Sequence, residues 1–218
     1  MIVHDRMRAY INSLNPGNTE WLEEIEREAI EAYVPVIRRE MQSFLKFLLA
    51  SFAPSRILEV GTAVGFSALF MSEYGPEGCQ ITTIENYEKR IPIARENFIR
   101  AGRDQQITLL PGDAMEILKG LPDTEPFDLI FVDAAKGQYL SYLPEVVRLL
   151  HPGGVLLSDN VLQDGDVIES RFAVERRNRT IHARMREYLY ELTHREDLTT
   201  SILPLGDGVT VSVKKGTV

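Results

Sequence analysis

The stretch FDLIFVDAAKG, residues 127–137, is an almost unbroken apolar run that ends in an acid, Asp133, with a lysine three positions later. Apolar runs without polar alternation are typical of strands that helices cover on both faces of a parallel sheet. A second run of this kind, at 155–158, is followed directly by Asp159 and Asn160. Both runs are therefore predicted to form central strands of a parallel sheet.

The order of elements along the chain supports this prediction. From Arg56 onward, β-prone runs alternate with helical stretches, which predicts βαβ units with helices on both faces of the sheet. The runs are RILEV (56–60), QITTI (80–84), ITLL (107–110), FDLIFV (127–132) and GGVLLS (153–158). TTSILPL and GVTVSV flank a Gly-Asp-Gly turn near the C-terminal end, which predicts an antiparallel hairpin at one edge. The predicted fold class is α/β and Rossmann-like, with a mostly parallel seven-stranded sheet.

Extra helices are predicted before the sheet. Asn18 or Thr19 is expected to cap a helix whose first turns are acidic, which suits the positive end of the helix dipole. Pro35 interrupts the pattern, and a second amphipathic stretch follows. Its apolar stripe, expected to be core or dimer contact, consists of Met41, Phe44, Leu45, Leu48 and Leu49.

Composition limits the class of protein. At 218 residues, 44% apolar and 26% charged, the chain is expected to form a single domain, 1–218, with an N-terminal helical segment (1–53) and a Rossmann-like core (54–218). A net charge of -8 argues against indiscriminate binding of nucleic acid but leaves room for a local basic patch. The single Cys79 cannot form an internal disulfide, which favours a cytoplasmic location. No export signal or membrane span is indicated, because charged residues interrupt the most apolar stretches.

The residues that follow each strand are the first candidates for a ligand site, because open α/β sheets bind ligands beyond the carboxyl ends of their strands. They are Glu59, Gly61 and Gly65 after the first run, Glu85 after the second, Asp113 after the third, Asp133 after the fourth, and Asp159 with Asn160 after the fifth. Each acid alone is an ordinary turn former or helix cap. When acids follow several strands at the same edge of a sheet, turn formation and helix capping alone are less able to explain them.

The first turn, EVGTAVGFS (59–67), carries glycines that allow a ligand to approach the backbone closely, but it does not match the G-x-G-x-x-G dinucleotide pattern. Glu85 lies at the spacing from this turn that places an acid on ribose hydroxyls, so a ribose-bearing cofactor is predicted. Asp113 and Ala114 are expected to hold an adenine edge, and helix capping by Asp113 is an equal alternative.

A metal site is predicted if the fourth and fifth strands are neighbours. Asp133, Asp159 and the amide oxygen of Asn160 would then converge as hard oxygen ligands, which suit Mg²⁺. Zinc is disfavoured because neither His nor Cys accompanies these residues. Lys136 is a candidate general base beside the metal, and the alternative is a solvated helix start.

The combined motifs resemble the cation-dependent class I O-methyltransferases, a family similar to catechol and caffeoyl-coenzyme A O-methyltransferases. The resemblance runs from about Met41 to Val213 and is carried by LEVGTAVGFSAL, ITTIE, GDA, FVDAAKGQY and LLSDNVL. It implies a class I methyltransferase fold, S-adenosylmethionine and Mg²⁺ as cofactors, and Lys136 as the catalytic lysine. The residues that would border S-adenosylmethionine are Ile37, Glu59, Gly61, Ser67, Glu85, Asp113, Ala114 and Asp133. The metal ligands would be Asp133, Asp159 and Asn160. The family resemblance also suggests a homodimer.

Within this family the chain is most similar to the bacterial branch that methylates 5-hydroxyuridine at the tRNA wobble position, on VDAAKGQY, DNVLQDGDV and ILPLGDGVTVSVKK. A cluster of arginines after the metal ligands is expected to grip the anticodon loop, with Phe172 or Tyr188 available for stacking on bases. The cluster consists of Arg171, Arg176, Arg177, Arg179, Arg184 and Arg186. Two alternatives remain open. One is an O-methyltransferase of small catechol-like phenols whose arginines are a solvated surface, and the other is a catalytically idle nucleotide-binding or RNA-binding protein.

Overall fold

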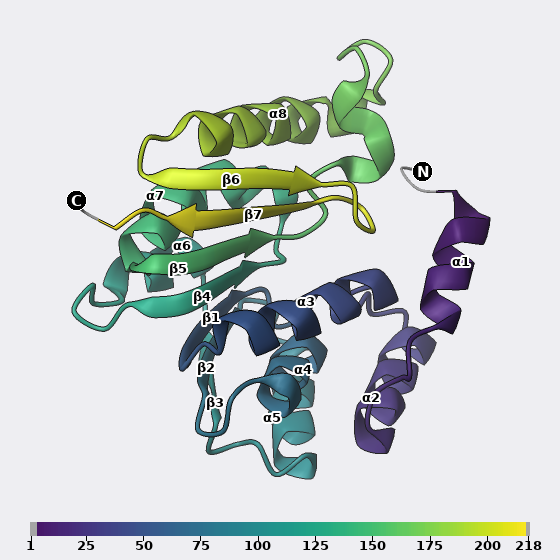
Figure 1. Ribbon diagram of the computed structural model, residues 1–218, viewed down its shortest axis with the longest axis vertical. Coiled ribbons are helices and arrows are strands. Elements are labelled where there is room, and N and C mark those ends of the chain that lie inside the picture. Colours follow the sequence, from purple (N-terminus) through teal and green to yellow (C-terminus); the bar gives the residue numbers. More distant parts are fainter. Residues whose placement is uncertain (1–3, 217–218) are drawn as a thin grey trace. The chain divides into compact units, whose positions relative to one another are not determined.

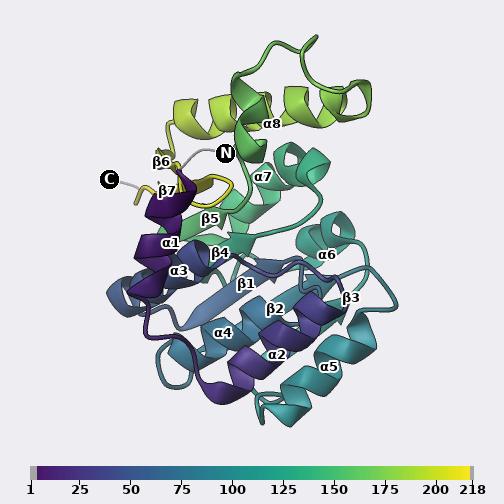
Figure 2. The same ribbon diagram turned by 90° about the vertical axis from the view of Figure 1, so that its right-hand side faces the viewer.

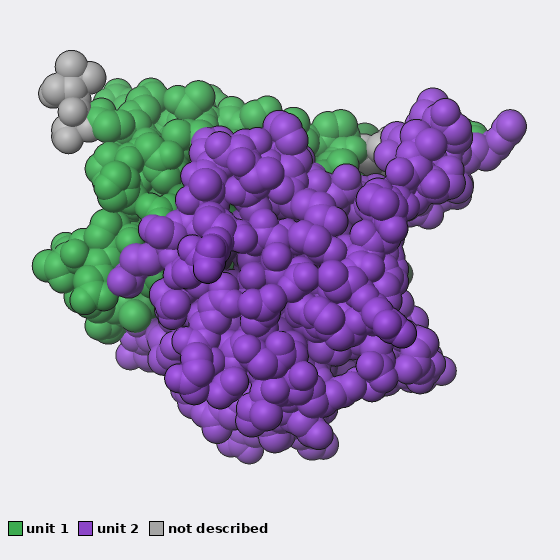
Figure 3. Space-filling view, turned by 60° about the horizontal axis from the view of Figure 1, so that its bottom comes forward, with its two compact units in different colours: residues 1–4, 118–218 green, residues 5–117 purple. Residues whose placement is uncertain are grey.

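The computed structural model describes residues 4–216, which divide into two compact units (Figure 3). Unit 2 contains residues 5–117, and unit 1 contains residues 118–216 with His4. The helices are α1 (Asp5–Ser13), α2 (Glu20–Glu31), α3 (Arg39–Phe52), α4 (Phe66–Tyr74), α5 (Ile91–Arg100), α6 (Ala114–Gly120), α7 (Tyr139–Leu149) and α8 (Arg179–His194), with short 3₁₀ turns η1 (Lys136–Gln138), η2 (Gln163–Ile168) and η3 (Arg176–Asn178). The single-domain organisation expected from chain length stays a prediction.

The strands are β1 (Arg56–Val60), β2 (Gln80–Glu85), β3 (Ile107–Pro111), β4 (Phe127–Val132), β5 (Leu150–Ser158), β6 (Leu198–Leu203) and β7 (Val209–Lys214). Their order in the seven-stranded sheet is β3-β2-β1-β4-β5-β7-β6. β7 pairs antiparallel with both β5 and β6, as expected of the C-terminal hairpin. The predicted fold class is therefore confirmed.

In unit 2 the three strands are parallel, with β2 between β1 and β3 (Figure 2). The last four residues of β1 are buried, as are Ile81 and the final three residues of β2. α4 is covered along nearly its whole length and packs near β2 and β3, which explains why its sequence lacks a polar face. These apolar strands and α4 support the turns at the carboxyl ends of β1 and β2.

In unit 1, β4 and β5 are parallel neighbours, with Val132 opposite Ser158 at their carboxyl ends. Ile130 and Phe131 are fully buried, which confirms that the opening stretch of the sequence forms an interior strand. α7 packs against β5, and α8 packs against α7 and β6, where Figure 1 shows it running along the hairpin. The loops that follow β4 and β5 therefore begin at strands of a sheet that α7 and α8 cover.

The N-terminal helices agree with most of the sequence prediction. α2 begins directly after Thr19, although no side chain caps it. Four of the five stripe residues in α3, Met41, Leu45, Leu48 and Leu49, are buried, so the stripe is core and the expected homodimer stays a prediction. Cys79 is also buried. Across residues 4–216, each helix is too short or too polar to traverse a lipid bilayer.

Candidate active site

The candidate site is described as two groups of residues, one in each unit. The cofactor edge lies at the carboxyl ends of β1, β2 and β3 in unit 2 and consists of Glu59, Gly61, Ser67, Glu85, Asp113 and Ala114. The metal edge lies at the carboxyl ends of β4 and β5 in unit 1 and consists of Asp133, Lys136, Asp159 and Asn160.

The turn after β1 brings backbone groups close to the end of β2. The amides of Gly61 and Thr62 both donate to the carbonyl of Ile84, at 3.1 Å. Gly65 has a φ of +89°, and a Cβ on it would lie 2.5 Å from the ring of Phe98. Only glycine meets both conditions at this position. The turn is therefore held tightly between the two strands, and the close approach of a ligand to its backbone stays a prediction.

Glu85 links the ends of the two strands through its carboxylate. One oxygen accepts from the amide of Ala63 at 2.7 Å. The other accepts from the amides of Asn86 and Tyr87, at 2.9 and 2.8 Å. Charge-assisted bonds of this kind fix the position of a carboxylate. The acid predicted to bind ribose is thus preorganised by the backbone around it.

A buried polar chain lies beneath this turn. The hydroxyl of Thr83 donates to the Glu59 carboxylate, and the hydroxyls of Thr62 and Thr83 lie 2.5 Å apart. Glu59 and Thr83 are fully buried. Glu59 therefore takes part in the buried hydrogen bonds that support the turn. Its place in the sequence did not indicate this structural role.

The remaining residues of the cofactor edge lie at helix starts. Ser67 is buried in the first turn of α4, and Ala114 is the first residue of α6. The Asp113 carboxylate accepts from the amides of Met115 and Glu116, at 2.9 and 3.2 Å. The helix-capping alternative for Asp113 is therefore present, and its side chain remains exposed.

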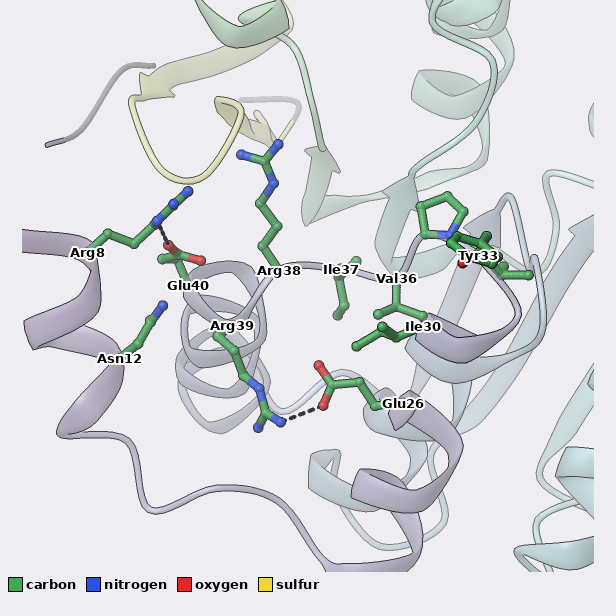
Figure 4. Close-up of a pocket in the computed structure, with 12 residues that line it drawn as sticks. Arg8, Asn12, Glu26, Ile30, Tyr33, Val36, Ile37, Arg38, Arg39 and Glu40 are labelled. Carbon is green, nitrogen blue, oxygen red and sulfur yellow. Dashed lines mark ion pairs between the residues drawn. The ribbon is translucent and has the colours of Figure 1, made fainter. Parts of the chain in front are cut away.

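Ile37 lies in the loop between α2 and α3. It is buried and lines a pocket of about 630 Å³ formed by α1, α2 and this loop (Figure 4). Its carbonyl accepts from the side chain of Gln42, which also donates to Glu26. Burial raises the pKa of Glu26, and Arg39 pairs with it at 2.7 Å. A hydrogen bond from Arg39 lowers the pKa of Glu23 to about 2. Polar side chains thus hold the loop that carries Ile37.

The metal edge begins at the paired ends of β4 and β5. Because Val132 is opposite Ser158, Asp133 and Asp159 leave neighbouring strands at the same level. Asp159 is 4% exposed, and Asn160 has a φ of +58°, a conformation that Asn tolerates better than most residues. The structure therefore confirms the strand adjacency on which the predicted metal site depends.

The Asp133 carboxyl lies in a surrounding that disfavours its charge. Burial raises its pKa to about 6, and the positive charge of Lys136 opposes that rise. An anionic carboxylate at this position is stabilised by a cation close to it. The donor set of two acids and one amide oxygen at the metal edge therefore fits Mg²⁺. Within residues 4–216, no three His, Cys, Asp or Glu side chains gather in an arrangement able to hold a metal, so the amide oxygen is needed to complete this set.

Lys136 has a partner that is distant from it in the sequence. Its ammonium lies 3.3 Å from the carboxylate of Asp207, which is in the turn between β6 and β7 and is 4% exposed. Asp207 also accepts from the amide of Asp164, so it holds two segments of unit 1. The sequence indicated only that the residue forms a turn, because its partner lies 71 positions away. Lys136 is therefore held by a buried acid and is not a freely solvated helix start.

Tyr139 is a second residue for which no role was predicted. Its hydroxyl lies 3.2 Å from the carbonyl of Val132, 3.1 Å from the carbonyl of Asp159 and 3.3 Å from the amide of Ala134. The side chain is buried. Burial, followed by the charges of Asp133 and Asp159, raises the pKa of the phenol well above its usual value. Both carboxylates therefore lie near one neutral hydroxyl.

The arginine cluster makes several contacts within unit 1. Arg184 donates to the carbonyl of Gly137 at 2.8 Å, Arg179 donates to the carbonyl of Val174 at 3.2 Å, and Arg177 pairs with Glu175 at 2.7 Å. Arg186 also donates to a backbone carbonyl, whereas Arg171 and Arg176 are exposed. Part of this charge is therefore used to hold the segment between β5 and α8 and to join α8 to η1.

One of the two aromatic residues proposed to stack on bases does not suit that role. Tyr188 is 1% exposed, its ring packs edge-on against Tyr139, and its hydroxyl lies 2.6 Å from that of Ser158. The prediction failed because Tyr188 is on the face of α8 that packs against the sheet. Phe172 is 84% exposed and stays available.

Comparisons with known proteins found a matching family and several similar chains. The model of the O-methyltransferase family matches residues 12–215. A catechol O-methyltransferase of Niastella koreensis is 33% identical over 164 residues, which are 73% of this chain and 74% of that protein. A caffeoyl-CoA O-methyltransferase of Populus kitakamiensis is 30% identical over 213 residues, 93% of this chain and 89% of that protein. The O-methyltransferase of Bacillus cereus, solved in complex with SAH, superimposes with a TM-score of 0.83 at 26% identity and covers 95% of this chain and 96% of its own.

Proposed function

Because the chain belongs to the O-methyltransferase family, we propose that it transfers the methyl group of S-adenosylmethionine to one hydroxyl of a small catechol-like phenol, with Mg²⁺ at the metal edge. The observation that carries the proposal is the register of β4 and β5, which places Asp133 and Asp159 side by side. The catechol and caffeoyl-CoA O-methyltransferases among its relatives support an acceptor with two neighbouring oxygens.

The cofactor edge is proposed to bind S-adenosylmethionine. SAH, found in the Bacillus cereus relative, is what remains of this cofactor after its methyl has been transferred. The preorganised carboxylate of Glu85 suits the ribose hydroxyls, and the turn at Gly61 and Gly65 lets the ligand approach the backbone. Ile37, Ser67, Asp113, Ala114 and Asp133 are proposed to border the same cofactor.

At the metal edge, Asp133, Asp159 and Asn160 would hold Mg²⁺, whose positive charge favours the ionised form of the acceptor hydroxyl. That oxygen would attack the sulfonium methyl while the carbon–sulfur bond breaks and the sulfur leaves as the thioether of SAH, and the hydroxyl proton would pass to solvent or to Lys136. Lys136, held by Asp207, stabilises the developing negative charge or accepts the proton after losing its own. A pH profile of kcat for variants of Lys136 separates these roles.

A second acceptor, 5-hydroxyuridine of tRNA, presents the same neighbouring oxygens. The observations that favour it are the exposed side chains of Arg171, Arg176 and Phe172. The internal contacts of Arg179 and Arg184 weigh against it, because they stabilise the protein without any RNA. The small phenol is therefore the main proposal.

The test is transfer of labelled methyl from S-adenosylmethionine to pyrocatechol and, separately, to tRNA containing 5-hydroxyuridine, with Mg²⁺ or with EDTA. We expect transfer to pyrocatechol that EDTA abolishes and that the double variant Arg176→Glu, Arg177→Glu preserves. Transfer to tRNA alone, lost in the double variant, would replace the small phenol by tRNA. An absence of transfer to both acceptors, together with no calorimetric binding of S-adenosylmethionine, would refute the methyltransferase proposal.

A further inference from the structure

The phenolic oxygen of Tyr139 contacts three peptide groups of unit 1. The carbonyl of Val132 belongs to the peptide that leads into Asp133, and the amide of Ala134 belongs to the peptide that leaves it. The carbonyl of Asp159 belongs to the peptide that joins it to Asn160. All three proposed metal ligands are therefore attached to peptide groups in contact with one side-chain atom.

These contacts use most of the hydrogen-bonding capacity of the hydroxyl. A phenol has one proton to donate, which is shared between two carbonyls at 3.2 and 3.1 Å, and it accepts from one amide at 3.3 Å. The carbonyl of Val132 also accepts from the amide of Asp159 at 3.0 Å. Backbone bonding between β4 and β5 thus continues past the last paired residues and includes Tyr139.

The ring of Tyr139 is itself fixed. It is 1% exposed and packs edge-on against Tyr188, with ring centroids 5.5 Å apart and an interplanar angle of 76°. Tyr188 is anchored to β5 through Ser158, at 2.6 Å between hydroxyl oxygens. A buried aromatic pair of this geometry restricts rotation of both rings. The hydroxyl of Tyr139 therefore stays at one place between the strand ends.

We propose that Tyr139 is a positioning residue, whose hydroxyl holds the backbone of Asp133, Asp159 and Asn160 so that their oxygens are preorganised for a divalent cation. The inference rests on the proposed function, and it gives Tyr139 the role of fixing the geometry of the metal edge. Partners that orient metal ligands commonly contribute about 10–100-fold to metal affinity. Tyr139 begins α7 directly after η1, so it also ties the segment that starts at Lys136 to the same strand ends.

The test is direct binding of Mn²⁺, a paramagnetic substitute for Mg²⁺, to Tyr139→Phe, measured by electron paramagnetic resonance without acceptor. We expect affinity to fall about 10–100-fold, whereas S-adenosylmethionine affinity measured by calorimetry stays within twofold of wild type. A purely structural role would instead lower both affinities or the thermal stability alone. Unchanged Mn²⁺ binding in Tyr139→Phe would overturn the inference.

Tyr188→Phe is the matched control, because it removes the other hydroxyl of the pair, which bonds a side chain instead of the ligand peptides. We expect a smaller loss of Mn²⁺ affinity than in Tyr139→Phe, and an equal loss would refute the specific role of the Tyr139 hydroxyl. If Tyr139→Phe does not fold, Tyr139→Met removes the same hydroxyl while keeping apolar volume. If wild-type protein binds no Mn²⁺, the metal site of the proposed function fails, which is distinct from a failure of Tyr139 alone.

Discussion

The cofactor edge and the metal edge both follow buried parallel strands, but their carboxylates are held in different ways. At the cofactor edge, Glu85 receives three backbone amides, two of them from the next two residues in the chain. At the metal edge, the side chains of Tyr139 and Asp207 fix the peptides of the acids and the ammonium of Lys136. An edge organised by neighbouring backbone is suited to a large polar ligand, whereas neighbouring acids are stabilised in their ionised form by a cation.

The strongest way to break this comparison is to remove an acid from the metal edge. Asp159→Ala deletes a buried acid that is proposed to bind the metal. We expect methyl transfer to catechol to fall by about 10³-fold or more, since a metal contributes several kcal/mol to stabilising the transition state. The measurement is kcat at saturating S-adenosylmethionine, with calorimetry to show that cofactor affinity is unchanged. Asp166→Ala, an exposed acid of the same unit, is the control. Full activity in Asp159→Ala would remove the metal from the proposed mechanism.

Changing Lys136 tests whether its side chain stabilises the negative charge of the acceptor oxygen or accepts the proton. Lys136→Met is expected to lower kcat about 100-fold without changing cofactor affinity, because the ammonium paired with Asp207 is lost. Lys136→Arg keeps a positive charge but does not release a proton near neutral pH. Recovery of kcat in Lys136→Arg would therefore indicate electrostatic stabilisation, and lack of recovery would favour proton transfer.

Lys215→Met, at an exposed lysine of the same unit, controls for loss of surface charge. A kcat for Lys136→Met within twofold of wild type would show that this lysine has no part in the reaction.

The difference between the edges also explains what the sequence could predict. The strands, the glycine turn and the position of Glu85 follow from local patterns, since apolar runs and strand-end acids can be read along the chain. The contact of Lys136 with Asp207 and that of Tyr139 with Asp159 could not, because each joins residues that only folding brings together. The burial of Tyr188 was missed for a similar reason, since helix periodicity does not say which neighbour covers a face.

At the cofactor edge, Glu85→Gln tests the role of the bound carboxylate. The side chain of Gln has only one acceptor oxygen. Its NH₂ group would therefore face backbone N–H groups that now donate to the carboxylate. The cofactor would also lose a charged acceptor for its ribose hydroxyls. A hydrogen bond to a charged group contributes about 1.5–3 kcal/mol, which predicts S-adenosylmethionine binding about 10–100-fold weaker, with Mn²⁺ affinity unchanged. Glu88→Gln, an exposed acid on the same segment, is the control. If metal affinity falls equally, the two edges do not act separately.

The smallest expected effect is the rise in melting temperature that Mg²⁺ causes. This rise should depend on pH, because the Asp133 carboxyl of the metal edge changes its ionisation. Burial raises the pKa of Asp133 to about 6, so the carboxyl is ionised at pH 7.5, and at pH 5 a metal ion must displace its proton. With Mg²⁺ at about ten times its Kd at pH 7.5, we expect the melting temperature to rise by about 3–6 °C. At pH 5 the same concentration should raise it by about 1 °C, because affinity is about tenfold weaker there. Calorimetric melting against NaCl at matched ionic strength measures both shifts, and Asp159→Ala should show neither. An equal shift at the two pH values would show that the cation binds away from Asp133.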